Sequence, residues 1–264
     1  MDQILEQDEK DKSEPVRLLH HFACTGGTLI AKCIASMPNT VVLSEVEPHS
    51  HLQYGESRFF PTDLIRLVRA ASRELGEDLE SEVFLAGLAA IRDHCRKSAL
   101  RLILRDHAHS RYCTGPAVSP APSLREVTQA RYPSISVVTV RHPLDSFLSL
   151  TRNRWIHFEP GDIGEYAQRY VQFLDDHDEL PLFRYEDFVA DPEHVTRDIC
   201  DRFELPFEPD FLTTFAAHKL SGDSGRSAPV ISDRPRLPVP EQIETDKASS
   251  ATYRELCARL DYEP

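Results

Sequence analysis

The chain has 264 residues, of which 41% are hydrophobic and 10 are glycine, so it can bury a sizeable core and is not typical of a disordered protein. Its 43 acidic and 30 basic side chains give a net charge of −13, which disfavours binding to nucleic acid or anionic lipid through a broad basic surface. Residues 1–15 are too charged for a signal peptide, no apolar run has the length of a membrane span, and the six cysteines include no close pair. We therefore expect a cytoplasmic protein, without integral membrane association, that binds any anionic ligand through a local basic site.

The first half of the chain alternates apolar strands with amphipathic helices. Residues 1–14 are expected to form a mobile leader, and residues 15–264 a single domain. Apolar residues at helical spacing follow a glycine pair and end at Pro38, which predicts a helix over 27–37. The other elements predicted up to residue 155 are strands at 16–23, 40–46, 100–107 and 134–143, two helices between 61 and 98, and a helix that begins at residue 143.

The second half predicts a short fifth strand at 180–188 and a helix after Asp191, with that residue as N-cap and Pro192 in the first turn. A loop is expected at 108–132, and a closing helix from about residue 241. Continuous apolar strands that alternate with helices indicate an α/β domain with a central parallel sheet of about five strands flanked by helices. Ligands of such sheets bind beyond the carboxyl ends of the strands.

The segment 23–28, with the sequence ACTGGT, has the form of an anion-binding turn. A strand that enters a helix through two glycines leaves backbone N–H groups unpaired at the positive end of the helix dipole. Thr25 and Thr28 add two hydroxyl donors beside Gly26 and Gly27. The nucleotide-binding pattern G-x-x-x-x-G-K-[ST] is not matched, because the first glycine and the lysine are missing. An ordinary strand-to-helix turn is the alternative.

A second candidate for anion binding follows the fourth predicted strand. Arg141 ends this strand in the sequence RHPLDSFLS, and Ser149 lies about two helical turns later. A guanidinium can bind a phosphate through two hydrogen bonds, and a serine hydroxyl can donate to the same group. The alternative is an arginine that ends a strand and a serine packed between helices.

Together these segments resemble the sulfotransferases that use 3′-phosphoadenosine-5′-phosphosulfate (PAPS). In that family a turn of the type P-[KR]-S-G-[ST]-T binds the 5′-phosphosulfate, and residues 24–28, CTGGT, are similar to it. The family's 3′-phosphate site is an arginine with a serine eight residues later, and Arg141 and Ser149 match this spacing. LILRDHAH and RYEDF resemble further family segments, so the resemblance extends from about residue 16 to about residue 260. It implies a P-loop NTPase-like sulfotransferase fold, PAPS as cosubstrate and no metal.

Cys24 is the main departure from the family pattern, because the family has lysine or arginine there. That basic residue stabilises the charge that develops during transfer, an electrostatic task often worth several kcal/mol. Arg105, at the end of the third strand, is the expected substitute by position. Lys32 lies one turn too deep in the helix and is expected to reach solvent. Whether Cys24 impairs catalysis stays open.

Transfer of a sulfuryl group to an alcohol also needs a base that removes the hydroxyl proton. Three candidates follow strand ends: Glu45 and Glu47 after the second strand, and His107 after the third. In cytosolic family members a histidine like His107 has this role, and in carbohydrate-modifying members a glutamate after the second strand does. The resemblance does not choose among the three, and each glutamate alone could be a solvated loop residue.

Histidine pairs and a late polar loop are the remaining candidates. His49 with His51, or His107 with His109, could share a face of an extended segment, but twelve histidines make such pairs common by chance, so no metal site is predicted. The polar segment 219–240 resembles a basic family loop that closes over the 3′-phosphate, and Arg226 is the residue expected there. A flexible surface loop is the alternative.

The sequence therefore predicts a sulfotransferase that moves a sulfuryl group from PAPS to a hydroxyl of a carbohydrate, a lipid or a small metabolite, and releases 3′-phosphoadenosine-5′-phosphate (PAP). A P-loop-type kinase or NTPase, and a non-catalytic nucleotide-binding protein of the same fold, are the alternatives. We expect residues 48–60 and 108–132 to line the acceptor site. The identity of the acceptor and the oligomeric state are left open.

Overall fold

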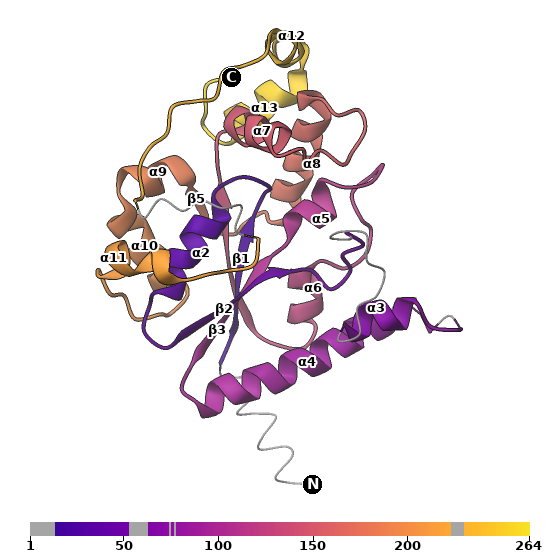
Figure 1. The fold of residues 1–264 in the computed structure, drawn as a ribbon, viewed down its shortest axis with the longest axis vertical. Helices are drawn as coiled ribbons and strands as arrows, with labels where there is room; N and C mark the ends of the chain where they lie inside the picture. Colours follow the sequence, from indigo (N-terminus) through magenta and orange to yellow (C-terminus); the bar gives the residue numbers. More distant parts are fainter. Residues whose placement is uncertain (1–13, 53–62, 74, 77, 223–229) are drawn as a thin grey trace.

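A parallel sheet of five strands forms the centre of the molecule, as predicted, with the strand order β2-β3-β1-β4-β5 (Figure 1). The computed structural model describes residues 14–52, 63–73, 75–76, 78–222 and 230–264. The predicted leader, apart from Glu14, and the candidate Arg226 lie outside these ranges. The strands are β1 (Val16–His21), β2 (Thr40–Val46), β3 (Arg101–Asp106), β4 (Ser134–Val140) and β5 (Leu182–Arg184).

The central strand β1 is buried along its whole length, which explains its continuous apolar pattern. It pairs with β3 on one side, where Leu19 lies opposite Arg105, and with β4 on the other, where His21 lies opposite Thr139. Because all the strands are parallel, their carboxyl ends meet at one edge of the sheet. The segments predicted to carry chemistry follow these ends.

Helices cover both faces of the sheet. One face packs against α2 (Gly27–Ala35), α9 (Tyr185–Ala190), α10 (Pro192–Arg202), α11 (Phe211–Thr214) and the short 3-10 helix Phe215–Ala217. The other face packs against α4 (Asp78–Lys97), α5 (Ala108–Tyr112), α6 (Leu124–Gln129), α7 (Pro143–Arg152), α8 (Ile163–Asp176) and α13 (Ala251–Arg259). Two further helices, α3 (Leu64–Arg69) and α12 (Glu241–Ser249), have no buried residue.

Several elements differ from the sequence predictions. The fifth strand is only three residues long, and the sequence YEDFVA that follows it forms α9. The loop expected at 108–132 contains α5 and α6, and the sequence analysis missed α8 altogether. The closing helix is two helices, α12 and α13. The start of α10 is as predicted, because Asp191 caps it by accepting the N–H of His194 and Pro192 lies in the first turn.

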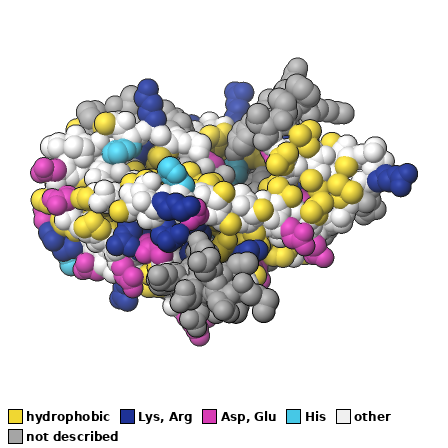
Figure 2. All heavy atoms as spheres, turned by 90° about the horizontal axis from the view of Figure 1, so that it is seen from below, with side chains coloured by type: hydrophobic (Ala, Val, Ile, Leu, Met, Phe, Trp, Pro, Cys, Tyr) yellow, Lys and Arg dark blue, Asp and Glu magenta, His cyan; other side chains and the backbone are white. Residues whose placement is uncertain are grey.

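Apolar side chains gather on the side of the molecule where α3 and α4 lie (Figure 2). Leu64 and Leu67 of α3 and Ile91 of α4 are exposed. The helix α3 contributes polar anchoring rather than core, because Arg69 at its end donates to the carbonyl oxygens of Ser50 and Pro48 at 2.5 and 3.0 Å. It thereby holds the segment that follows β2.

Candidate functional site

The turn between β1 and α2 has the geometry of an anion-binding turn. Gly26 is the N-cap of α2 with φ +88°, and no side chain caps the helix start. A Cβ atom on Gly26 would lie 2.3 Å from the ring of Tyr185, and one on Gly27 would lie 2.4 Å from the ring of His21. The first N–H groups of α2 therefore have no capping side chain, and they lie at the positive end of the helix dipole. Such a helix start can bind an anion.

The two threonines of the turn have different surroundings. Thr25 is fully buried, and its hydroxyl donates to the carbonyl oxygen of Phe22 at 2.7 Å, which braces the turn from inside. The hydroxyl of Thr28 lies at the surface, 3.5 Å from the carbonyl oxygen of Gly222. Of the two predicted hydroxyl donors, Thr28 is the one placed at the surface of the turn.

Arg141 approaches the same tyrosine ring, Tyr185, that packs against Gly26. Its guanidinium carbon is 5.0 Å from the centre of the Tyr185 ring, a distance at which a cation is attracted by a ring face. Its Nη1 atom is buried and has no hydrogen-bond partner among the residues that the structure describes. A buried donor of this kind would be stabilised by an anionic ligand that accepts from it. The structure thus brings together the two segments predicted to hold the nucleotide.

Ser149 is buried in α7, and its hydroxyl donates to the carbonyl oxygen of Asp145 at 2.8 Å. It would have to turn away from this bond to donate to a ligand. The Asp145 carboxylate accepts two hydrogen bonds from Arg236, at 2.9 and 3.3 Å. Arg236 is therefore a described arginine of the polar segment 219–240 that reaches α7.

Arg105 is fully buried and bound on all sides by protein groups. Its guanidinium donates to the Ser44 hydroxyl at 2.7 Å, to Nε2 of His21 at 2.7 Å and to the Ser221 carbonyl oxygen at 3.0 Å. It also forms an ion pair with Glu45. The charge of Arg105 is thus compensated inside the protein. Its predicted role toward a transferring group stays a prediction.

Glu45 bridges Arg105 and His107, which brings three of the predicted catalytic residues together. Its second carboxylate oxygen lies 3.0 Å from Nε2 of His107. Burial would raise the pKa of Glu45, but the hydrogen bond from His107 and the charge of Arg105 outweigh burial and lower the pKa to about 2. The strand β2 is irregular between Leu43 and Val46, and Glu45 has φ +63° there. Glu45 is thus a carboxylate with both oxygens engaged.

The segment Ser221–Gly222 is tied to the end of β2. The Ser44 hydroxyl donates to the carbonyl oxygen of Ser221 at 3.0 Å, and the Ser221 hydroxyl donates to that of Ser44 at 2.6 Å. Gly222 has φ +73°, and a Cβ atom there would lie 1.8 Å from a Glu45 carboxylate oxygen. A side chain at position 222 would overlap the Glu45 carboxylate, so packing explains the glycine at this position.

Glu47 has a different environment from Glu45, two residues before it. It lines a cavity of about 190 Å³ that also borders the helix α5. Burial raises the pKa of Glu47 to about 7, although its carboxylate accepts the N–H of His49 at 3.2 Å. A carboxylate with a pKa near neutrality can take up a proton and release it again, as a general base must. The cavity is lined by Glu47, His49, His51, Ser110, Arg111, Thr114, Gly115, Ala117 and Ser119.

Two helices hold the wall of this cavity in place. Nε2 of His49 lies 3.0 Å from the Ser81 hydroxyl, and its Nδ1 lies 3.3 Å from the Glu80 carboxylate. Arg69 of α3 donates to the same carboxylate, at 2.7 Å through Nε, and to the carbonyl oxygens of the segment after β2. The segment that carries Glu47 is therefore supported by charged contacts from α3 and α4.

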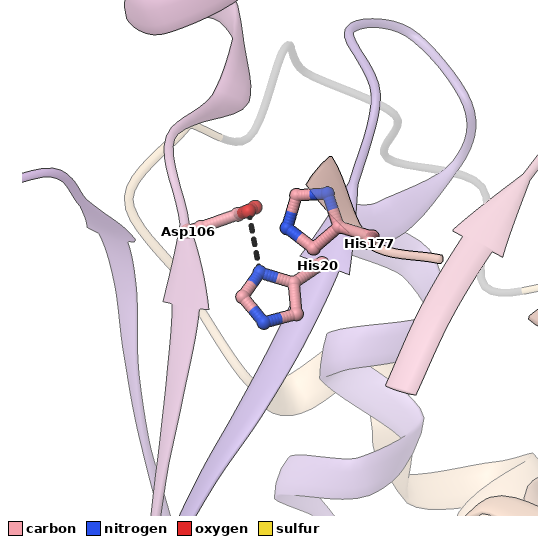
Figure 3. A group of neighbouring side chains, drawn as sticks. All are labelled: His20, Asp106 and His177. Carbon is pink, nitrogen blue, oxygen red and sulfur yellow. Dashed lines mark hydrogen bonds and ion pairs between the residues drawn. The ribbon is translucent and has the colours of Figure 1, made fainter. Parts of the chain in front are cut away.

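A buried polar group lies on the α8 face of the sheet, and the sequence analysis did not single it out. His20 of β1, Asp106 of β3 and His177 at the end of α8 point toward one another (Figure 3). Nδ1 of His20 donates to Asp106 at 2.8 Å, and Nδ1 of His177 donates to the Phe173 carbonyl oxygen at 2.7 Å. Burial lowers the pKa of both histidines to about 3 and raises that of Asp106.

This trio is the group of described residues whose ligand atoms could hold a metal ion, with those atoms within 4.8 Å of one another. The positive charge of Arg125 lowers the pKa of His20 further and opposes a second cation there. Neither predicted histidine pair belongs to such a group in the part of the chain that the structure describes. We interpret the trio as an internal hydrogen-bond network that supports the ends of β1 and β3.

Sequence reasoning also missed two contributors to the site, Tyr185 and Arg111. Tyr185 lies in the segment RYEDF, which resembled a family segment, but its contacts with Gly26 and Arg141 depend on β5 pairing with β4, the neighbour of β1. Arg111 lies in the range expected to line the acceptor site, and its charge was the available signal. No described helix is long and apolar enough to cross a membrane.

Comparisons with known proteins agree with this geometry. A model of the sulfotransferase family matches residues 22–209. The fold resembles the sulfotransferase domain from the curacin biosynthetic pathway, with a TM-score of 0.57, 16% identity, and coverage of 96% of this chain and 99% of that chain. It also resembles the sulfotransferase domain from the Synechococcus PCC 7002 olefin synthase, with a TM-score of 0.50, 17% identity, and coverage of 95% and 96%. Among curated proteins no significant match is found. Because the family model covers more than half of its length, this chain belongs to the sulfotransferase family.

Proposed function

We propose that this chain transfers a sulfuryl group from PAPS to the hydroxyl of an acceptor and releases PAP. The family makes it a sulfotransferase, and the residues at the carboxyl ends of β1 and β4 support PAPS as the donor. In this proposal the start of α2 binds the 5′-phosphosulfate, and Arg141 binds the 3′-phosphate. The six free cysteines support a reducing, cytoplasmic location.

The buried Nη1 of Arg141 is the observation that carries the proposal. It is a guanidinium donor without a partner among the described residues, and the Tyr185 ring contacts both this arginine and Gly26 of the glycine turn. A phosphate would satisfy this donor, while the N–H groups of Gly27 and Thr28 would bind a second anionic group. PAPS carries two such groups on one nucleoside, so the chain's own residues fit it.

Glu47 is the base that the geometry supports best. Its pKa of about 7 makes it able to accept a proton near neutrality, and it borders a cavity that an acceptor can enter. The acceptor oxygen attacks sulfur while its proton passes to the Glu47 carboxylate. The bond between sulfur and the 5′-phosphate oxygen breaks, so that the sulfate ester of the acceptor and PAP are the products.

The other two base candidates have a supporting role in this proposal. The pKa of Glu45 is lowered to about 2, so it is a weak base, and its two oxygens bind Arg105 and His107. Glu45 therefore positions His107 at the end of β3. His107 stays a candidate for contact with the acceptor, because its charge acts on Glu47 and lowers that residue's pKa.

Calorimetry with PAP, AMP and ATP tests the proposal against a kinase or NTPase. PAP, measured with a chelator present, should bind at least about tenfold tighter than AMP, and about tenfold tighter than ATP measured with Mg²⁺ and no chelator. The reason is that only PAP carries the 3′-phosphate that can accept from Arg141. Tighter binding of ATP–Mg²⁺ than of PAP would contradict the proposal. A non-catalytic nucleotide-binding protein would bind PAP but release none from PAPS with any of a broad panel of alcohols.

A further inference from the structure

Arg111 lies on the wall of the cavity that Glu47 borders, which we call the acceptor cavity. It has no role in the sulfuryl transfer proposed above. It lies in α5, directly after the end of β3, and donates from Nη1 to the carbonyl oxygen of Ala121 at 2.7 Å. Its Nε atom is buried and has no hydrogen-bond partner among the residues that the structure describes. A buried guanidinium donor without an acceptor is unfavourable, so a ligand atom that accepts from it would be stabilised there.

Arg111 forms no ion pair with a carboxylate among the described residues. Glu126 is near enough to feel its charge, but that carboxylate accepts the N–H and the hydroxyl of Ser123 at the start of α6. Glu47 also feels the charge of Arg111 without touching it. A base and a cation thus border one cavity without pairing with each other.

The cavity limits the size and the character of the group that enters it. Its volume of about 190 Å³ is below the range of about 300–1,000 Å³ that is usual for pockets of drug-sized ligands. The other described residues of its walls are small side chains and two histidines. The small volume suits a short skeleton better than a phenol ring with substituents or a lipid tail.

An anion can reach this cavity only if a local cation holds it, because the chain as a whole carries a net charge of −13. Arginine binds carboxylate and phosphate groups through two parallel hydrogen bonds, which fixes the orientation of the ligand as well as its position. A ligand fixed in this way would present a nearby hydroxyl to Glu47 in one direction.

We propose that the acceptor is a small hydroxylated anion, in which a carboxylate or phosphate bound by Arg111 shares a short skeleton with the hydroxyl that Glu47 deprotonates. This inference rests on the proposed sulfuryl transfer and adds the class of acceptor to it. Charge on the acceptor, rather than the length of an apolar chain, then decides which hydroxyl is sulfated. Neutral sugars and lipid alcohols become poor acceptors.

Matched pairs of ligands test the inference on the full chain saturated with PAP. The carboxylate arm compares 2-, 3- and 4-hydroxybutyrate with their amides, and the phosphate arm compares glycerol 3-phosphate with glycerol. Calorimetry should show at least one anion that binds about 10- to 100-fold tighter than its neutral partner, as expected for hydrogen bonds to a charged group. Equal binding within every pair, or no binding by any member, would overturn the inference.

Variants of Arg111 separate a binding role from a structural one. Arg111→Gln should remove the preference for the anion and leave the neutral partner unchanged, and Arg111→Lys should keep part of it. Arg96→Gln is the matched control, because Arg96 is exposed and pairs only with Asp93 in its own helix. A preference that survives Arg111→Gln contradicts the inference, and Arg111→Lys decides the matter if the glutamine variant does not fold.

The same samples distinguish failure of this inference from failure of the proposed function. PAP binding should be equal in the wild type and in all three variants, because Arg111 lies on the acceptor side of the sheet. If PAP binds and no anion is preferred, only the acceptor class is wrong. If the wild type does not bind PAP, the proposed function itself falls.

Discussion

The two arginines at the carboxyl ends of β3 and β4 make an instructive pair. Arg105 donates to three protein groups and forms an ion pair with Glu45, so its charge is used inside the fold. Arg141 faces the Tyr185 ring, and its buried Nη1 has no partner among the described residues. The two arginines thus hold similar positions at strand ends but differ in whether their hydrogen-bond donors have partners. The open donor of Arg141, taken together with the glycine turn that shares its contact with Tyr185, makes Arg141 the better candidate for a ligand contact.

The two glutamates after β2 repeat this contrast on the acceptor side. Glu45 has its pKa lowered to about 2 by its partners, and Glu47 has its pKa raised to about 7 by burial. One carboxylate is committed to the architecture, and the other is available for proton transfer. Arg105 and Glu45 are therefore engaged with each other inside the protein, whereas Arg141 and Glu47 can act on a ligand.

Replacement of Glu47 should give the largest effect. Glu47→Gln removes the base, so kcat should fall by about 10²- to 10⁴-fold. Because the base must be ionised, wild-type kcat should rise as the pH passes through about 7, and the variant should lose this rise. Steady-state rates over a pH series check both points. Glu82→Gln, on the exposed face of α4, is the control, and a variant that keeps the wild-type pH profile would exclude Glu47 as the base.

Removal of Arg141 should act on the nucleotide half alone. Arg141→Ala should weaken PAP by about 30- to 1,000-fold, since a buried charged contact is lost, and should weaken AMP much less because AMP lacks the 3′-phosphate. Calorimetry with both nucleotides measures the difference. Arg152→Ala is the control. Arg152 is an exposed arginine of α7, the helix that follows β4, so its replacement should change neither affinity. Equal losses for PAP and AMP would refute a role in 3′-phosphate binding.

The ion pair of Glu45 should appear as a pH-dependent stability. Its folded pKa of about 2 lies below the ordinary value of 4.5, so it stabilises the fold above about pH 4.5 and loses this effect as the pH falls toward 2. Glu45→Gln should be less stable at neutral pH, and its gap to the wild type should narrow by about 2 kcal/mol between about pH 7 and about pH 3. Urea unfolding at the two pH values gives this difference. A constant gap would show that the pair does not stabilise the fold.

Replacement of Cys24 should have the smallest effect. Its thiol packs against the apolar cluster on the α8 face of the sheet, and the turn presents backbone N–H groups to the ligand. Cys24→Ala should therefore change PAP affinity by less than about threefold. The same calorimetry checks this. A loss above tenfold would place the thiol at the nucleotide and would require a new account of the turn.

Much of the fold follows from local patterns in the sequence. The continuous apolar run of β1, the glycine turn and the Asp191-Pro192 helix start were all predicted, because burial, φ restraints and capping act within a few residues. The fifth strand was predicted too long because its apolar and aromatic residues suit a strand as well as the helix α9. Lys32 was expected in solvent but is buried, because α11 and the residues after it pack against α2.

The candidate site could be predicted only in part. Sequence spacing placed Arg141, Glu45, Glu47 and His107 at strand ends, and the structure agrees with that placement. Which carboxylate is committed and which can act depends on the ion pairs of Glu45 with Arg105 and His107 and on the burial of Glu47, which no local pattern reveals. The roles of Thr25 and Ser149 were likewise set by hydrogen bonds to nearby carbonyl oxygens. The hydrogen bonds of the folded protein decide these roles, and sequence spacing does not contain them.

The tie between Ser44 and Ser221 also sets an order of events during synthesis. The chain emerges amino end first, and the strands β2 and β3 are made long before Ser221. Arg105 is made much earlier, yet it obtains the Ser221 carbonyl only after the chain has extended to that residue. Closing so long a loop costs entropy, so this contact forms late. The nascent protein therefore completes the walls of the Glu47 cavity, whose residues end at Ser119, before it can tie Ser221 to the end of β2.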